Sequence, residues 1–303
     1  MGLALGLPAP AEARKSKTRP SPRELALAPL LRSGSLDELA QVCPQLLQEG
    51  NVRLLQKLQA RLLTLNPAPQ PLPVVLANAD VLLRCGAPQA ALNVLERYGP
   101  APGVERNQWL LLRWQAANAG LDHRVAVEAL RDLAAGQMAS LASLQLPVRS
   151  NSDGTVTTRA ALDLLAASLE SLGQPRAAAE VLLASRTPGE AMARRLGQAV
   201  ALLRQLPLSE QMRLLELALD QAAADGAWGL VSELLDRQLA LPATPETAAV
   251  RAKAAERRIR LSRRIDDAYG EWRVQRTPEL ERQLRSPRAA GGHAAPSIPA
   301  PNP

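Results

Sequence analysis

Residue types that catalyse reactions or bind metals are sparse in this 303-residue chain. It contains two histidines, His123 and His293, and two cysteines, Cys43 and Cys85, all far apart in sequence. A tetrahedral metal site gathers three or four such ligands, and no acidic cluster at ligand spacing completes one here. We therefore expect no metal, no cofactor and no catalytic residue.

The glycine motifs of nucleophilic catalysis and phosphate binding are also missing from the sequence. No serine lies in a Gly-x-Ser-x-Gly pattern, and the Gly-Gln-Pro at 173–175 reads as a helix turn rather than a phosphate loop. The loop around Asn151, Asp153 and Gly154 lacks the alternating acids and the bidentate glutamate of a calcium loop. Because catalytic triads are assembled in space, an enzyme with an unrecognised helical active site stays an alternative.

The sharpest candidate for a binding site is a basic run between Arg251 and Arg264. Of its cations, we take five as candidate contacts to a partner or an anion: Arg257, Arg258, Arg260, Arg263 and Arg264. Such density attracts the phosphates of a nucleic acid, an anionic membrane face or an acidic protein. It is also common on a solvated helix, and Asp266, Asp267 and Glu271 follow directly.

The net charge of +7 is concentrated at the two ends of the chain. Residues 1–32 carry +4 and residues 251–303 carry +6, whereas residues 33–250 carry −3. A slightly acidic body between basic ends differs from a domain with a basic groove. This pattern favours arms that add electrostatic attraction to a partner.

The composition predicts an all-α protein. Leu and Ala supply most of the 47% hydrophobic residues, Phe is absent, and aromatic residues make up 2% of the chain. Leu and Ala favour helices, whereas strands select β-branched and aromatic side chains. The longest charge-free run, at 62–79, contains four prolines, so no transmembrane helix is expected.

The two cysteines and the N-terminus bear on the cellular compartment. Two cysteines cannot make a disulfide framework, and nothing in their spacing forces Cys43 to pair with Cys85. The apolar stretch near residue 1 lacks the preceding basic residues of a secretory signal. We therefore expect a reducing compartment and a cytoplasmic protein.

Two segments of the chain align without a gap, Gly86–Leu95 and Gly173–Leu182. In each, glycine ends one helix, proline begins the next, and small residues follow where two helices cross closely. Gly120 lies 34 residues after Gly86, and Gly226 opens a further second helix. This recurrence predicts antiparallel helical hairpins repeated along the chain.

Residues 74–241 resemble a divergent run of tetratricopeptide repeats. The best unit, Leu162–Pro188, has the large-large-small-large first helix of the family and its turn glycine, Gly173. Trp109 and Leu112 fit the tryptophan and leucine that open the family's first helix, although most aromatic positions of the family hold Leu or Ala here. The resemblance implies a right-handed α-solenoid that binds a protein or peptide on its concave surface.

The expected organisation has six segments. They are a disordered basic arm at 1–21, N-terminal helices at 22–66, a Pro-rich connector at 67–73, the repeats at 74–241, a basic helical segment at 246–285, and a disordered tail at 286–303. An inserted loop or small hairpin interrupts the repeats at 147–157, where an Asp-Gly pair favours a turn.

A stripe of mostly apolar residues in the basic segment recurs every three or four positions, at Ala255, Ile259, Ser262, Ile265, Tyr269 and Trp272. This narrow stripe predicts one long helix from about 246 to 272, which caps the stack or packs against another chain. Trp109, Trp114 and Trp228 lie on apolar helix faces, and we expect them in the core.

Together these patterns predict a non-enzymatic scaffold or adaptor that binds a protein or peptide partner on a helical-repeat surface. The main alternative is a nucleic-acid-associated protein that uses the basic C-terminal helix and the N-terminal arm. The sequence specifies neither the partner nor the oligomeric state.

Overall fold

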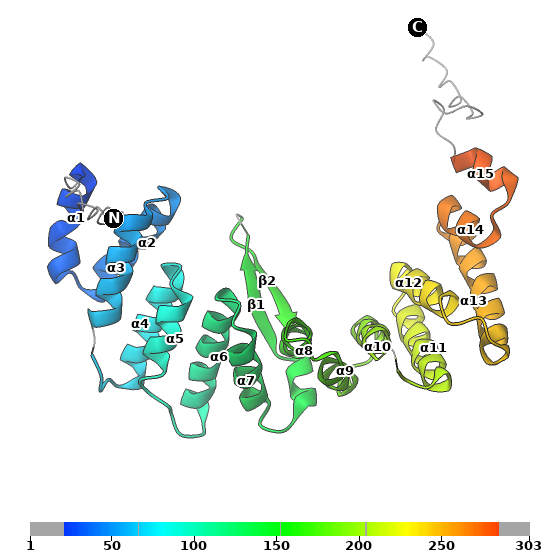
Figure 1. Ribbon diagram of the computed structural model, residues 1–303, viewed down its shortest axis with the longest axis horizontal. Helices are drawn as coiled ribbons and strands as arrows, with labels where there is room; N and C mark the ends of the chain where they lie inside the picture. The colour runs from blue at the N-terminus through cyan, green and yellow to red at the C-terminus, as the bar shows by residue number, and fades with distance from the viewer. Residues whose placement is uncertain (1–20, 66, 152, 204, 285–303) are drawn as a thin grey trace, which may run out of the picture. The chain divides into compact units, whose positions relative to one another are not determined.

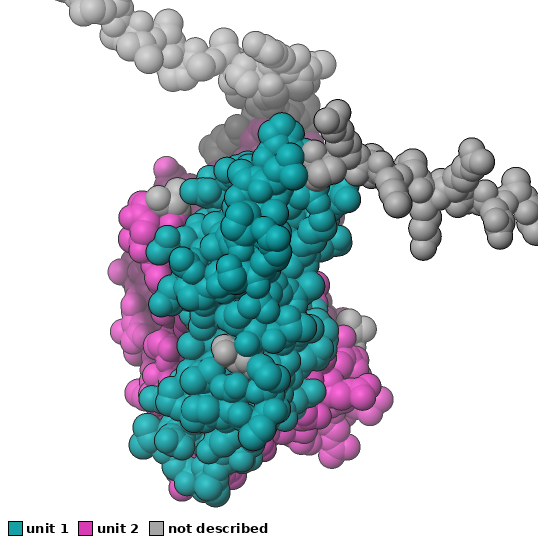
Figure 2. All heavy atoms as spheres, turned by 90° about the vertical axis from the view of Figure 1, so that its left-hand side faces the viewer, with its two compact units in different colours: residues 1–120 teal, residues 121–303 magenta. Residues whose placement is uncertain are grey.

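The computed structural model describes residues 21–284 apart from residues 66, 152 and 204 (Figure 1). The predicted tail at 286–303 and nearly all of the predicted arm at 1–21 lie outside the described residues. The described chain is all-α apart from one two-stranded sheet, as the composition predicts. It forms two compact units, residues 1–120 and residues 121–303, coloured separately in Figure 2. The division falls inside the expected repeat region of 74–241.

The described part of unit 1 consists of six helices, α1 (Pro22–Ser33), α2 (Leu36–Gln48), α3 (Val52–Leu65), α4 (Leu72–Arg84), α5 (Pro88–Leu95) and α6 (Val104–Ala119). Buried apolar residues three or four positions apart contribute to its core, on α2 at Leu39, Cys43 and Leu46 and on α3 at Leu54, Leu58 and Leu62. Trp114 of α6 is 1% exposed and Trp109 is 9% exposed, so both tryptophans lie in the core as expected. The indole of Trp109 donates a hydrogen bond to the Leu95 carbonyl at the end of α5.

A disulfide joins Cys43 of α2 to Cys85 at the C-terminal end of α4. The two Cα atoms are 5.1 Å apart, and both residues are almost completely buried. The sequence leaves this pairing open, and the structure forms it. Because α2 packs against α4 in the fold, residues 42 positions apart become neighbours, which their spacing alone does not indicate.

Unit 2 begins with helix α7 (His123–Ala134), a short 3-10 helix η1 (Met138–Ala142) and a β-hairpin. Strand β1 (Gln145–Ser150) pairs antiparallel with β2 (Val156–Ala160), and their register shifts between Pro147 and Arg149. The connecting turn contains Gly154, whose φ is +83°. The structure thus has a hairpin where the sequence predicts an inserted loop or small hairpin.

Eight further helices complete the described part of unit 2: α8 (Ala161–Ser171), α9 (Pro175–Leu183), α10 (Glu190–Leu202), α11 (Leu208–Ala224), α12 (Trp228–Leu239), α13 (Pro245–Arg264), α14 (Ala268–Gln275) and α15 (Pro278–Leu284). Consecutive helices from α8 to α15 pack against one another. No helix in the described residues is long and apolar enough to cross a membrane.

In each of four helical hairpins, the two helices are joined by a turn of the same conformation. Gly50, Gly86, Gly173 and Gly226 all have φ between +62° and +70°. In each case the following N–H donates to a carbonyl five residues earlier, at 2.9–3.0 Å, which is the hydrogen bond of a Schellman motif. At Gly120 the left-handed residue is instead Leu121, with φ +56°. A local sequence signal, glycine followed closely by a helix start, therefore produces a repeated structure.

The C-terminal segment contradicts the prediction of one long helix from about 246 to 272. Helix α13 ends at Arg264, Asp266 takes a left-handed φ of +57°, and α14 begins at Ala268. The carboxylate of Asp267 accepts a hydrogen bond from the Gly270 N–H at 2.8 Å, so it caps the new helix. The expected apolar stripe is divided by this turn, and Tyr269 is 56% exposed.

Candidate binding site

A groove in unit 2 is lined by helices α11, α12 and α13, and its volume is about 360 Å³. We call it the cationic groove and define it by its lining residues, which are Leu219, Asp220, Ala223, Trp228, Val231, Leu235, Arg257, Arg260, Leu261 and Arg264. The four lining residues of α13 recur at three- and four-residue spacing and therefore share one helix face. Three of the five candidate arginines lie on this face.

The floor of the cationic groove is apolar and rigidly packed. Leu219, Val231, Leu235 and Leu261 are each less than 9% exposed, and they belong to a core that extends from α10 to α13. Buried side chains in a close-packed core hold fixed positions. The floor is therefore a preformed apolar surface.

At the N-terminal end of the α13 face that lines the groove, an ion pair joins α13 to α11. Arg257 Nη1 of α13 lies 2.8 Å from Oε2 of Glu216 on α11. Burial raises the pKa of Glu216, but hydrogen bonds from Arg257 and Gln238, together with the charges of Arg257 and Lys253, outweigh it and hold that pKa below its ordinary value. Arg257 is thus already neutralised by a carboxylate of unit 2.

At the other end, the guanidinium of Arg264 lies over the indole ring of Trp228, with Cζ 4.7 Å from the ring centroid. Such cation–π contacts fix an arginine that would otherwise sample many rotamers. Trp228 is half-buried: it packs against the core, as expected, and it also lines the groove. It is the first residue of α12.

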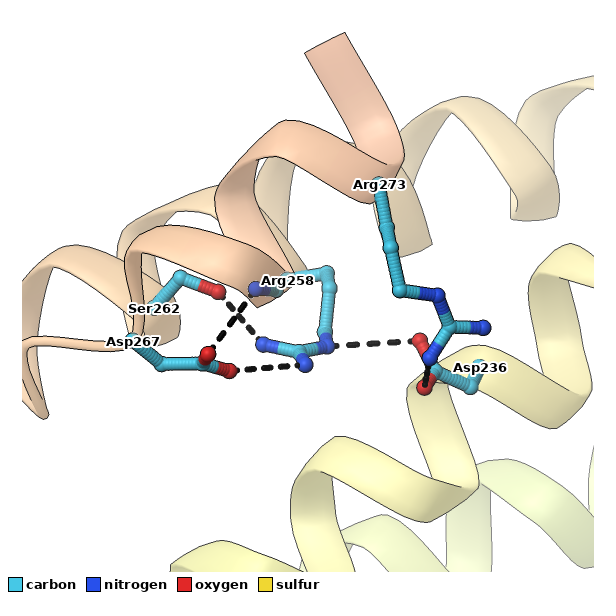
Figure 3. Close-up of polar contacts among 6 residues, drawn as sticks. Asp236, Arg258, Ser262, Asp267 and Arg273 are labelled. Carbon is cyan, nitrogen blue, oxygen red and sulfur yellow. Dashed lines mark hydrogen bonds and ion pairs between the residues drawn. The ribbon is translucent and has the colours of Figure 1, made fainter. Parts of the chain in front are cut away.

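Arg258 does not line the groove; it is only 5% exposed and lies among Asp236, Ser262 and Asp267 (Figure 3). Its Nε lies 3.3 Å from Oδ1 of Asp236, and its Nη2 lies 3.0 Å from Oδ2 of Asp267. It also donates to the Ser262 hydroxyl, and Arg273 pairs with the second oxygen of Asp236 at 3.0 Å. These contacts fasten α14 to α12 and α13, so the structure gives Arg258 a packing role.

The last two candidate arginines differ from each other. Arg263 Nε donates to Glu271 of α14 at 2.8 Å, so its charge is paired on the surface. Arg260 is exposed at the groove and, among the described residues, has no hydrogen-bond or ion-pair partner. The five candidate arginines therefore separate into Arg260 and Arg264, which face the groove with their donors free, and three arginines engaged by Glu216, Asp236, Asp267 and Glu271.

No group of three or more metal-ligating side chains comes together in the part of the chain that the structure describes. His123 is the first residue of α7, away from the groove, and the other histidine lies outside the described residues. No protein-family model matches this chain, and no curated protein or solved structure is significantly similar to it. Function is therefore inferred from the groove itself.

Proposed function

We propose that this protein is a non-enzymatic scaffold or adaptor that binds a segment of a protein partner in the cationic groove. The observation that carries the proposal is the preformed apolar floor beside the unpaired cations of Arg260 and Arg264. Ligand sites are concave and mostly apolar, with a few placed polar groups that fix orientation. The groove has this construction.

The succession of helical hairpins supports the wider interpretation. The four glycine turns share one conformation and one hydrogen bond, as expected for repeated units. A tetratricopeptide-like solenoid is therefore the architecture that we propose, and its right-handed superhelix is part of that proposal. Proteins of this construction present extended surfaces to partners.

Nucleic-acid binding is less favoured by the charges around the groove. A protein that neutralises phosphates needs cations that are free to approach them. Arg257, Arg258 and Arg263 are instead paired with carboxylates of unit 2, and Asp220 lines the groove itself. We keep nucleic acid as an outcome of the test.

The test blocks the groove and compares co-purified partners. Ala223 is exposed and lines the groove, whereas its neighbour Ala224 is exposed and does not line it. Affinity purification from the native cell, with cross-linking and with or without nuclease, is performed with the full chain and with the Ala223→Trp and Ala224→Trp variants. Both variants should unfold at the temperature of the parent protein.

We expect specific proteins to be retained by the parent chain and by the control variant Ala224→Trp, and to be lost with Ala223→Trp. Nuclease should leave this pattern unchanged. Partners that persist with Ala223→Trp would show that the groove is not the binding site. Loss of all partners after nuclease treatment would favour the nucleic-acid alternative.

A further inference from the structure

We infer that the cationic groove recognises an acidic partner segment, in which an apolar side chain fills the floor and nearby carboxylates bind Arg260 and Arg264. This inference rests on the proposed function and specifies the chemistry of the partner. It follows from three features of the groove: the size of its floor, the placement of its free cations, and the acid on its opposite wall.

The floor has room for a few apolar side chains of a partner, but not for a longer segment. At about 360 Å³ the groove is near the lower limit of ligand sites, so it has room for a few side chains. Leu219, Val231 and Leu235 supply aliphatic surface, and a polar group placed against them would lose its hydrogen bonds to water without replacement. The segment must therefore present an apolar anchor.

The free cations lie on one edge of this floor. Arg260 and Arg264 are one helical turn apart on α13, so their side chains leave the same face. The Trp228 ring covers one face of the Arg264 guanidinium. Because the N–H donors of a guanidinium lie in its plane, stacking leaves them available to a carboxylate while it restricts the side chain. Two carboxylates one turn apart on a helical segment would match this pair.

An acidic residue on the opposite wall, on α11, determines which side of the partner segment can carry its acids. Asp220 lies on α11 one turn after Glu216, which contacts Arg257 of α13, so Asp220 follows that ion pair along the groove. A carboxylate placed beside Asp220 would be repelled. The acids of the partner must therefore face α13, and a polyanion with charge on all sides fits this groove poorly.

The experiment selects random peptides, displayed on phage, with the full chain and with three variants. Ala223→Trp blocks the groove. Arg260→Glu replaces one of the two free positive charges with a negative charge but leaves the stack of Arg264 on Trp228 intact. Arg186→Glu is the matched control, because Arg186 is an exposed arginine of the α9–α10 connection that does not line the groove.

We expect the parent chain and Arg186→Glu to enrich peptides with an apolar residue and Asp or Glu within about one helical turn of it. Arg260→Glu should lose this acidic preference, and Ala223→Trp should enrich none of these peptides. For an enriched synthetic peptide, changing Glu to Gln should weaken binding to the parent chain about tenfold, measured by fluorescence anisotropy.

The outcomes separate the two proposals. Enrichment of apolar peptides without acidic residues, blocked by Ala223→Trp, would overturn the inference and leave the proposed function standing. Enrichment of the same peptides by Ala223→Trp would overturn both, as would the absence of enrichment by the parent chain. An unchanged acidic preference with Arg260→Glu would overturn the inference alone.

Discussion

Arg195 of α10 and Asp163 of α8 form a two-pronged ion pair, with Nε 2.6 Å from Oδ1 and Nη2 3.1 Å from Oδ2. The Arg195 side chain is 5% exposed and also donates to the Ser185 hydroxyl at 2.7 Å. The pair connects two helices of unit 2 that are not consecutive. Helix α9, which lies between them in sequence, packs against both α8 and α10, so the ion pair links the two helices on either side of it.

Replacing Arg195 with Ala should destabilise unit 2 by about 2–3 kcal/mol, because Asp163 and Ser185 would lose their donor. The cost stays below that of a fully buried pair, since the Asp163 side chain is 30% exposed. Amide hydrogen exchange in α8 and α10 measures the change. Arg194→Ala is the control: its pair with Glu190 is exposed, so it should cost about 0.5 kcal/mol or less. Equal effects would contradict this role for Arg195.

Reduction of the Cys43–Cys85 disulfide should destabilise unit 1. The bond closes a loop between residues 42 positions apart. Because the bond restricts the unfolded chain, its loss should lower the free energy of unfolding by about 2–4 kcal/mol. Thermal unfolding with and without a reductant measures the shift. The Cys43→Ser/Cys85→Ser double variant should unfold at the lower temperature under both conditions. A parent protein that is insensitive to reductant would show that the bond contributes nothing to stability.

Gly173→Ala should cost about 1 kcal/mol, through backbone conformation alone. The φ of Gly173 is +70°, and no atom lies within 4 Å of the position that a Cβ would occupy. Gly173→Asn should cost less, because asparagine tolerates the left-handed region better. The free energy of unfolding from urea titration distinguishes the two variants. A cost for Asn equal to that for Ala would show that the left-handed conformation is not what selects glycine here.

The helical hairpins could be predicted from the sequence because their turns depend on nearby residues. Gly86, Gly173 and Gly226 each end a helix by their own conformation, so the signal and the structure lie within a few positions. The turn between α13 and α14 was missed because Asp266, rather than glycine, takes the left-handed conformation there. Asp267 three residues before Gly270 was the available signal, since aspartate caps helix N-termini.

The candidate site could be predicted only in part, because its charges are decided by tertiary partners. The acids that engage Arg257 and Arg258 include Glu216 and Asp236, which are 41 and 22 residues away in sequence. No local pattern separates these two arginines from Arg260. The pairing of the cysteines has the same cause, because it depends on how α2 meets α4.

Arg258→Ala and Arg260→Ala should therefore differ strongly in stability, although both remove one arginine from the same helix. Arg258→Ala should cost about 2–4 kcal/mol, because Asp267 would lose its partner in a partly buried site. Arg260→Ala should change stability by no more than about 0.5 kcal/mol. Hydrogen exchange in α14 measures both. Similar protection in the two variants would contradict the network of Figure 3.

Acid should loosen the packing of α14 through Asp267. The hydrogen bond from the Gly270 N–H lowers the pKa of Asp267; burial opposes this, and the contacts with Arg258 and Arg273 lower it further. A carboxyl whose folded pKa is depressed stabilises the fold fully above its unfolded pKa of about 3.9. That stability is lost as the pH falls through the lower, folded pKa. Protection of α14 amides should therefore be constant from neutral pH to about 5 and decrease below about 4.

Asp267→Asn isolates the charge, because the amide oxygen can still accept from Gly270. The amides of α14 should be less protected in this variant than in the parent chain at neutral pH. The two proteins should show similar protection as the pH falls, because protonation of Asp267 in the parent chain removes the same charge. Asp153→Asn is the local control: the Thr155 hydroxyl and N–H lower the pKa of Asp153 in the β-hairpin turn, away from α14. It should leave the pH dependence of α14 unchanged. Parallel curves for the parent chain and Asp267→Asn down to about pH 2 would mean that another group controls the acid response.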